Sequence, residues 1–202
     1  MKQELLMRYP NLGACIEDIE KAKEAMITCY EQGGKILLCG NGGSSADCEH
    51  IAGELMKGFL KKRPVLEDER LKEFDEEFLK RLQGGLPAIA LPSMTGVNTA
   101  FANDVDPAMV YAQAVLALGK ENDVLIGLST SGNAANVANA LKVAKALNMT
   151  VIGLSGGTGG KMKEISDICI CAPEKETFKI QELHLPIYHY LCAMVEDYFY
   201  KI

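Results

Sequence analysis

The stretch Lys35-Ile36-Leu37-Leu38-Cys39-Gly40-Asn41-Gly42-Gly43-Ser44-Ser45 decides the fold. Its short apolar run, residues 35–39, predicts a buried β-strand, and the glycines and serines after it predict a tight turn. From Ala46 to Phe59, apolar residues return at helical spacing. A strand, a glycine-rich loop and a helix in this order form the repeating unit of α/β domains with parallel sheets.

The same order of elements repeats along the chain. Further strands are predicted by apolar runs at 86–91, 123–128, 150–154 and 166–171. Helical spacing is present at 12–32, 99–118, 134–147 and 180–200, with an interruption near 104–107. Apolar strands that alternate with helices predict a three-layer α/β sandwich, with a five-stranded parallel sheet flanked by helices. In such sheets, ligands bind beyond the carboxyl ends of the strands, where helix N-termini also point.

Composition and charge narrow the class of protein. With 202 residues, of which 48% are hydrophobic and 24% charged, the chain is expected to fold as one domain, residues 1–202. The net charge of −6 argues against nucleic acid as a partner, because phosphate backbones are held by clustered Lys and Arg. The first ten residues lack the apolar core of a signal peptide or a membrane-spanning segment. We therefore expect a cytoplasmic protein with no membrane partner.

A charged insert interrupts the α/β pattern at about residues 61–83. It is dense in charges of both signs, with apolar residues at roughly helical intervals. This pattern predicts an amphipathic surface helix whose charged face is solvated. A lid or a contact between subunits is the alternative role.

The seven cysteines are scattered and contain no CxxC pair, which predicts reduced structural thiols. Cys169 and Cys171 could in principle hold a soft metal. We expect their sulfurs to point to opposite faces of a strand, which disfavours that alternative.

The loop Ser129-Thr130-Ser131-Gly132-Asn133 joins the third predicted strand to a helix. Three hydroxyls, a flexible glycine and the positive end of a helix dipole are what a phosphate group needs. The alternative is a capping loop in which Ser and Thr only satisfy the start of the helix.

The loop 40–45 is a second candidate phosphate cradle. It lacks the Lys of a nucleotide-binding P-loop, which disfavours a nucleoside triphosphate.

The chain's three histidines stand in two segments. His50 and Glu54 are four residues apart, so they share one face of the predicted helix. His184 and His189 stand on the last predicted helix together with Gln181. Their concentration indicates a joint function, although a His/Glu pair at this spacing is more often a surface hydrogen bond.

Taken together, these motifs resemble the SIS (sugar isomerase) family, and within it most closely the phosphoheptose isomerases. The resemblance is carried by 39–45, the spacing on to His50 and Glu54, and the segments 102–104, 128–133 and 180–184. It covers nearly the whole chain except the charged insert. As a set the motifs are specific, whereas Ser-Thr-Ser-Gly-Asn alone indicates only a phosphosugar-binding SIS domain.

The resemblance implies an aldose–ketose isomerase that converts sedoheptulose 7-phosphate to D-glycero-D-manno-heptose 7-phosphate through an enediol, toward ADP-heptose. It also implies a homotetramer with zinc, one ion per subunit. By motif position, the metal ligands are His50, Glu54, Gln181 and His189. Glu54 is the implied base and His189 its acid partner. The implied substrate-binding residues are Asn41, Gly42, Gly43, Ser44, Asn103, Asp104, Ser129, Thr130, Ser131, Asn133 and Gln181.

Geometry raises a difficulty for this ligand set. Gln181 and His189 are eight residues apart, which is about 12 Å along an unbroken helix. Both can reach one ion only if the Gln181 side chain leans inward or the helix begins after it. His184, three residues after Gln181, is a reserve ligand or a partner of a ligand.

The chain also departs from the phosphoheptose isomerase pattern. Ala134 stands where another Ser is common, Gly58 where an Arg is frequent, and Phe178 in a segment that usually carries an acidic residue and an Arg. These departures put the identity of the substrate in doubt more than phosphosugar binding. Candidates to replace the lost cation are Lys57, Lys61 and Lys179.

Two alternative functions therefore stay open. One is isomerisation or sensing of another phosphosugar. The other is a noncatalytic protein that resembles the DnaA initiator-associating protein and binds a replication protein. Retention of Glu54 together with His50, Gln181 and His189 favours an enzyme, because a binding module has no need of an acid–base set.

Overall fold

A computed structural model describes residues 1–201 and contains one five-stranded sheet. Its strands are β1 (Ile36–Gly40), β2 (Ala88–Ala90), β3 (Val124–Leu128), β4 (Thr150–Gly156) and β5 (Ile168–Ala172). They lie in the order β2-β1-β3-β4-β5, and every neighbouring pair is parallel. The predicted strands are thus confirmed to within a few residues at their ends.

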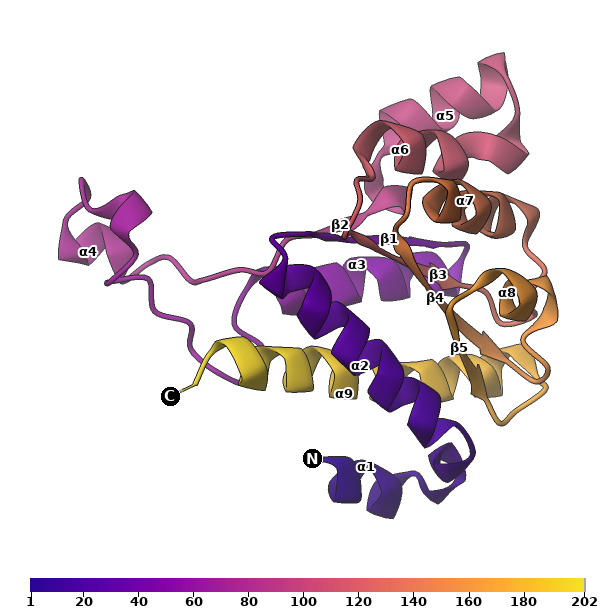
Figure 1. Ribbon diagram of the computed structural model, residues 1–202, viewed down its shortest axis with the longest axis horizontal. Helices are drawn as coiled ribbons and strands as arrows, with labels where there is room; N and C mark the ends of the chain where they lie inside the picture. The colour runs from indigo at the N-terminus through magenta and orange to yellow at the C-terminus, as the bar shows by residue number, and fades with distance from the viewer. Residues whose placement is uncertain (202) are drawn as a thin grey trace.

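Helices cover both faces of the sheet (Figure 1), which confirms the three-layer α/β fold. One layer contains α2 (Ile16–Glu31), α3 (Gly43–Met56) and α9 (Thr177–Phe199). The opposite layer contains α6 (Val110–Leu118), α7 (Ala135–Ala146) and α8 (Gly160–Ile165). Consecutive residues of a strand point to opposite faces of the sheet, so Leu37 packs against one helix layer and Leu38 against the other.

Seven further helices within residues 1–201 lie outside these layers or at their ends. They are α1 (Lys2–Arg8), η1 (Pro10–Cys15), η2 (Glu69–Leu71), α4 (Glu76–Leu79), η3 (Leu91–Ser93), α5 (Thr95–Asp104) and η4 (Pro107–Met109), where η marks a 3₁₀ helix. The break between α5 and η4 is the interruption predicted near 104–107. No helix within residues 1–201 is both long and apolar enough to cross a membrane.

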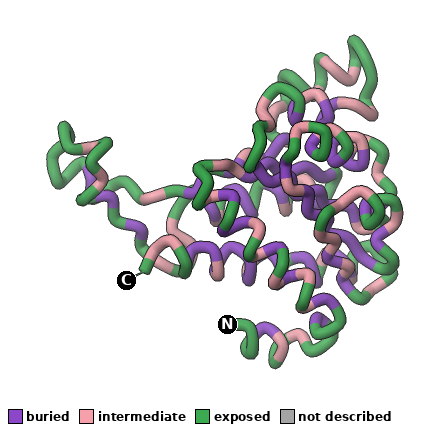
Figure 2. Tube along the Cα trace, in the orientation of Figure 1, coloured by how far each residue is buried: buried purple, intermediate pink, exposed green. Residues whose placement is uncertain are grey.

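The prediction of one helix over 61–83 is wrong. This segment, called the arm below, contains only the short helices η2 and α4 and projects away from the sheet (Figure 1). Asp75 begins α4 by accepting a hydrogen bond from the Phe78 amide at 2.8 Å. Most of the arm is exposed (Figure 2), and an amphipathic helix needs a surface on which to bury its apolar face. Among the described residues of the arm only Arg63, Val65 and Leu79 are buried, so most of its apolar face has no such surface.

The expectation for Cys169 and Cys171 is also wrong. Residues two apart in a strand lie on the same face, and their sulfurs are 3.8 Å apart on the edge strand β5. All seven cysteines are free thiols, as predicted.

Candidate active site

An open cavity of about 720 Å³ lies beyond the carboxyl ends of β3, β4 and β5. Its lining residues are Thr130, Ser131, Gly156, Gly157, Thr158, Pro173, Glu174, Lys175, Glu176 and Ile180. The helix α9 starts at this wall, because Glu176 is its N-cap. Hydroxyl groups, backbone amides and a helix N-terminus therefore meet where the sheet topology predicts a ligand site.

The loop 129–133 is held in one shape by close backbone packing. Gly132 has a φ of +67°, and a Cβ placed on it would lie 1.9 Å from the Gly159 carbonyl oxygen, so only glycine fits. The Asn133 side chain donates to the Ser131 carbonyl at 2.9 Å and accepts from the Lys161 amide at 3.2 Å. This packing leaves the Thr130 and Ser131 side of the loop facing the cavity, with Ser129 buried beneath it.

The glycine-rich loop after β1 packs beside the start of α9. Gly42 takes a φ of +57° at the N-cap of α3. A Cβ on Gly43 would lie 2.4 Å from Nε2 of Gln181, so the absence of a side chain is what lets Gln181 approach α3. The Asn41 side chain pairs with Asn136 at 2.9 Å, and Ser44 is buried in the first turn of α3. The loop thus brings Gln181 to the N-terminal end of α3.

Two turns further along, α3 and α9 bring His50, Glu54 and His189 together. His50 Nε2 lies 3.2 Å from Glu54 Oε1 and 3.4 Å from His189 Nε2. Burial lowers the pKa of the His189 imidazole, and the neighbouring His50 lowers it further. A neutral imidazole beside a carboxylate is a pair that can accept and return a proton.

Tyr188 orients the His50 ring. Its hydroxyl lies 3.0 Å from His50 Nδ1 and 3.2 Å from Asp47 Oδ1. A hydroxyl has one proton, so when Tyr188 donates to Asp47, it accepts from Nδ1–H of His50. The unprotonated nitrogen of His50 is then Nε2, which faces Glu54 and His189.

The cluster has the donor chemistry and the pairwise spacing of zinc ligands. Two nitrogens on one tetrahedral zinc lie about 3.3 Å apart, given Zn–N bonds of about 2.0–2.1 Å. The two separations measured from His50 Nε2 are of this size. Within residues 1–201, however, no group of three or more His, Cys, Asp and Glu side chains is placed to hold a metal ion as it stands.

Gln181 does not join this cluster in the single chain. It lies against Gly43, which precedes His50 by seven residues, or about 10 Å along α3. Because α9 is helical from Thr177 onward and runs through Pro186 without a break, the distance between Gln181 and His189 is not shortened.

Asn103 and Asp104 also lie elsewhere. They are exposed at the end of α5, where the Asn103 amide bonds to the Asp104 carboxylate at 2.9 Å, and neither lines the cavity.

The three lysines considered as replacement cations all pair with carboxylates. Lys57 pairs with Glu54, Lys61 with Asp197, and Lys179 with Glu176. Gly58 stands where phosphoheptose isomerases frequently have an Arg. A Cβ on Gly58 would lie 2.4 Å from the Lys61 carbonyl oxygen, so the turn into the arm excludes a larger residue. The cavity's own cation is Lys175.

Sequence reasoning missed Lys175, Tyr188 and Asp47. Lys175 stands in a connecting loop with no motif, and the Tyr188–Asp47 contact joins residues 141 apart in the chain. The cavity residues 156–158 do have a signal in the sequence, because residues 155–160 form a loop rich in Ser and Gly after a predicted strand, like the loops 40–45 and 129–133.

His184, the reserve ligand, faces away from the cluster and is fully buried. Its Nε2 bonds to the Ser155 carbonyl oxygen at 3.1 Å. Burial lowers its pKa to about 4, whereas the unfolded chain titrates near 6.5. Between these values the unfolded state binds more protons, so the free energy of unfolding falls as the pH falls.

We expect the titration of His184 to lower the free energy of unfolding by about 2–3 kcal/mol when the pH falls from 7 to 4.5. Urea unfolding of the wild type and of His184→Gln at both pH values checks this. Because other groups titrate in both proteins, the difference between their pH dependences is the measured quantity. Equal pH dependences would contradict the prediction.

The chain is similar in sequence and in fold to known proteins. Residues 14–84 and 74–156 match the family model of the SIS domain. The chain is 40% identical over 183 residues to phosphoheptose isomerase of Aneurinibacillus thermoaerophilus, covering 91% of this chain and 82% of the relative. It is 43% identical over 181 residues to phosphoheptose isomerase of Campylobacter jejuni, covering 90% and 87%. The solved phosphoheptose isomerase of Neisseria gonorrhoeae has a TM-score of 0.78 at 34% identity, covering 96% of this chain and 94% of that one.

Proposed function

Because this chain belongs to the phosphoheptose isomerases of the SIS domain family, we propose that it converts sedoheptulose 7-phosphate to D-glycero-D-manno-heptose 7-phosphate. The protein is a sugar phosphate isomerase. The observation that carries the proposed chemistry is the meeting of Glu54, His50 and His189 between α3 and α9, the two helices whose N-terminal ends lie near the hydroxyl-lined cavity.

Moving a carbonyl between C1 and C2 requires a base that takes a proton from one carbon and returns it to the other. We assign this role to the Glu54 carboxylate, with His189 holding or giving the proton at the sugar oxygen. Ser44, Ser129, Thr130 and Ser131 bind the phosphate group. Asn41, Gly42, Gly43, Asn103, Asp104, Asn133 and Gln181 complete the proposed substrate site.

The phosphate cavity and the acid–base cluster are separated within one chain. Ile180, which lines the cavity, precedes His189 by nine residues of α9, or about 14 Å. We propose a homotetramer in which neighbouring subunits share active sites. Such an assembly brings residues of two chains to one substrate and gives Asn103 and Asp104, exposed in the single chain, a substrate to contact.

We further propose one zinc ion per subunit, held by His50, Glu54 and His189, with Gln181 reaching it only after a change of side-chain conformation. When bound, zinc polarises the sugar carbonyl as a Lewis acid. Residues 1–202 are proposed to form a single SIS domain in the cytoplasm.

The test is turnover by purified wild-type protein, with and without added zinc. The substrates are sedoheptulose 7-phosphate, unphosphorylated sedoheptulose and a panel of shorter ketose phosphates. Conversion of the seven-carbon phosphate alone supports the proposal. If the protein converts another phosphosugar instead, that sugar is the substrate. No conversion at all favours the noncatalytic alternative. Thr130→Val keeps the side-chain shape and tests whether the hydroxyl lowers KM.

Replacing Tyr188 with Phe is expected to weaken zinc binding by about 10–100-fold, the usual effect of removing the partner that orients a ligating histidine. The substitution leaves the ring in place and removes only the hydroxyl that contacts His50 and Asp47. Competition with a zinc chelator measures the affinity. Tyr198→Phe, which removes an exposed hydroxyl bonded to Glu31, is the matched control. Equal affinities of the two variants would contradict the role given to Tyr188.

A further inference from the structure

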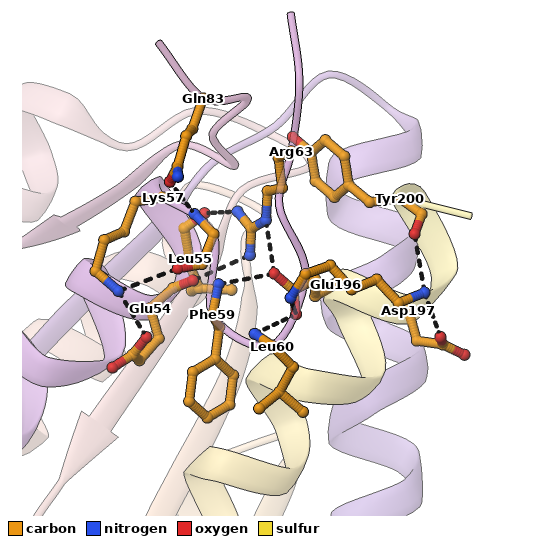
Figure 3. Close-up of polar contacts among 12 residues, drawn as sticks. Glu54, Leu55, Lys57, Phe59, Leu60, Arg63, Gln83, Glu196, Asp197 and Tyr200 are labelled. Carbon is orange, nitrogen blue, oxygen red and sulfur yellow. Dashed lines mark hydrogen bonds and ion pairs between the residues drawn. The ribbon is translucent and has the colours of Figure 1, made fainter. Parts of the chain in front are cut away.

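The root of the arm contains a fully buried arginine (Figure 3). Arg63 donates from Nε to Glu196 Oε1 at 2.9 Å. Its two terminal nitrogens donate to the carbonyl oxygens of Leu55 at 2.5 Å and of Glu54 at 3.0 Å. These carbonyls belong to the last turn of α3, where a helix lacks its own N–H donors. A guanidinium group there complements the negative end of the helix dipole. It gives the Glu54 carbonyl a donor, whereas the Leu55 carbonyl also accepts from the Leu86 amide at 2.9 Å.

The backbone at this point offers Glu54 no other route to a helical bond. In a longer helix, the Gly58 amide would donate to the Glu54 carbonyl. Here it donates to Gln83 Oε1 at 2.9 Å, at the end of the arm where the chain returns to the sheet. The arm thus ends α3 at Met56 and supplies Arg63 as the replacement donor.

Glu196 connects Arg63 and the arm root to α9. Its carboxylate accepts from the amides of Phe59 and Leu60, both at 2.8 Å, and from Lys61 at 3.1 Å, in addition to Arg63. Burial opposes ionisation of Glu196, but these donors outweigh it and lower its pKa. Glu196 follows His189 by two helical turns on α9. The helix that carries Glu54 and the helix that carries His189 are therefore bonded through one ion pair.

We propose that Arg63, held by Glu196, is a positioning residue for Glu54: it fixes the last turn of α3 against α9 and so sets the Glu54 carboxylate opposite His189. The proposal rests on the proposed catalytic role of Glu54. Arg63 is buried beneath the site and does not touch the substrate, so its effect is on orientation alone.

Arg63→Lys is the sharpest variant. It keeps the charge, but a point-like ammonium cannot bond Glu196 and two carbonyls at once as the planar fork does. We expect kcat to fall by about 10–100-fold, as for a displacement of a catalytic group by about 1 Å. KM is expected to stay within about twofold of wild type, because the phosphate loop 129–133 is untouched.

The matched control is Lys61→Met. Lys61 stands on the same arm root. Its side chain bonds Asp197 of α9 at 2.6 Å and the carbonyl of Tyr200, the C-cap of α9, at 2.9 Å, and within residues 1–201 it makes no hydrogen bond to α3. This variant is expected to keep the wild-type kcat and KM. A loss of kcat as large as that of Arg63→Lys would overturn the proposal, because any damage to the arm root would then suffice.

Amide hydrogen exchange gives a readout independent of turnover. In Arg63→Lys the amides of residues 52–56 should exchange faster than in wild type, because the last turn of α3 opens, while Lys61→Met leaves them unchanged. If wild type converts no phosphosugar, the proposed function fails, and unchanged exchange in Arg63→Lys separately overturns the structural part of the proposal.

If Arg63→Lys does not fold, a second variant tests the same proposal. Arg63→Met combined with Glu196→Gln leaves no unpaired charge and keeps an oxygen acceptor for the three arm amides, yet removes both bonds to α3. The same fall in kcat at unchanged KM supports the proposal. A folded double variant with wild-type kcat and wild-type exchange at 52–56 overturns it.

Discussion

Replacing Glu54 with Gln is expected to lower kcat on sedoheptulose 7-phosphate by about 10²–10⁴-fold, the contribution typical of a positioned general base. The amide keeps the size and one oxygen of the carboxylate, so it can still face His50, but it cannot take a proton from the sugar carbon. Glu54 is the carboxylate that contacts the histidine cluster, through the 3.2 Å approach of Oε1 to His50. Steady-state kinetics with saturating substrate measure the loss.

Glu49→Gln is the control for this prediction. Glu49 lies on the same helix, is exposed, and accepts a hydrogen bond from Ser93 at 2.8 Å outside the cluster. It is expected to retain wild-type kcat. A folded Glu54→Gln protein with wild-type turnover would remove Glu54 from the mechanism and leave the proton transfer to His189 or to another residue. Added zinc in parallel assays separates loss of the base from loss of a metal ligand.

Breaking the Arg63–Glu196 pair on one side is expected to lower the free energy of unfolding by about 3–5 kcal/mol, because the remaining charge stays buried without its partner. Arg63→Met leaves a buried carboxylate, and Glu196→Gln leaves a buried guanidinium group. Combining the two substitutions removes both charges. We expect the double variant to be more stable, by at least about 2 kcal/mol, than the sum of the single effects predicts.

Chemical denaturation of the four proteins gives this coupling directly. The exposed pair Lys61–Asp197 at the same arm root serves as the comparison, because a solvated ion pair contributes only about 0–1 kcal/mol. Additive effects of Arg63→Met and Glu196→Gln would show that the two groups do not depend on each other. That result would also remove the physical basis for coupling α3 to α9 through this pair.

The sequence predicted the site better in its parts than in its assembly. His50 and Glu54 are four apart on one helix, so local spacing was enough to place them on one face. The approach of His189 to His50 needed the packing of α9 against α3, and here the family resemblance supplied what spacing could not. Gln181 shows the reverse: the helical rise predicted a separation of about 12 Å from His189, and the chain keeps it.

By itself, the sequence determined the strand–loop–helix order, the parallel sheet, and the hydroxyl- and glycine-rich loops at its carboxyl edge, because these follow from periodicities of two and 3.6 residues and from local turn chemistry. Tertiary structure decided the rest. The apolar spacing of the arm predicted one helix, but among the described residues the arm buries only Arg63, Val65 and Leu79, so most of the apolar face has no surface to pack against and the long helix does not form. Arg63 looked like one charge among many on that arm. Only the meeting of α3, α9 and the arm root buries it, because its partners, Glu54, Leu55 and Glu196, come from segments that no local pattern connects.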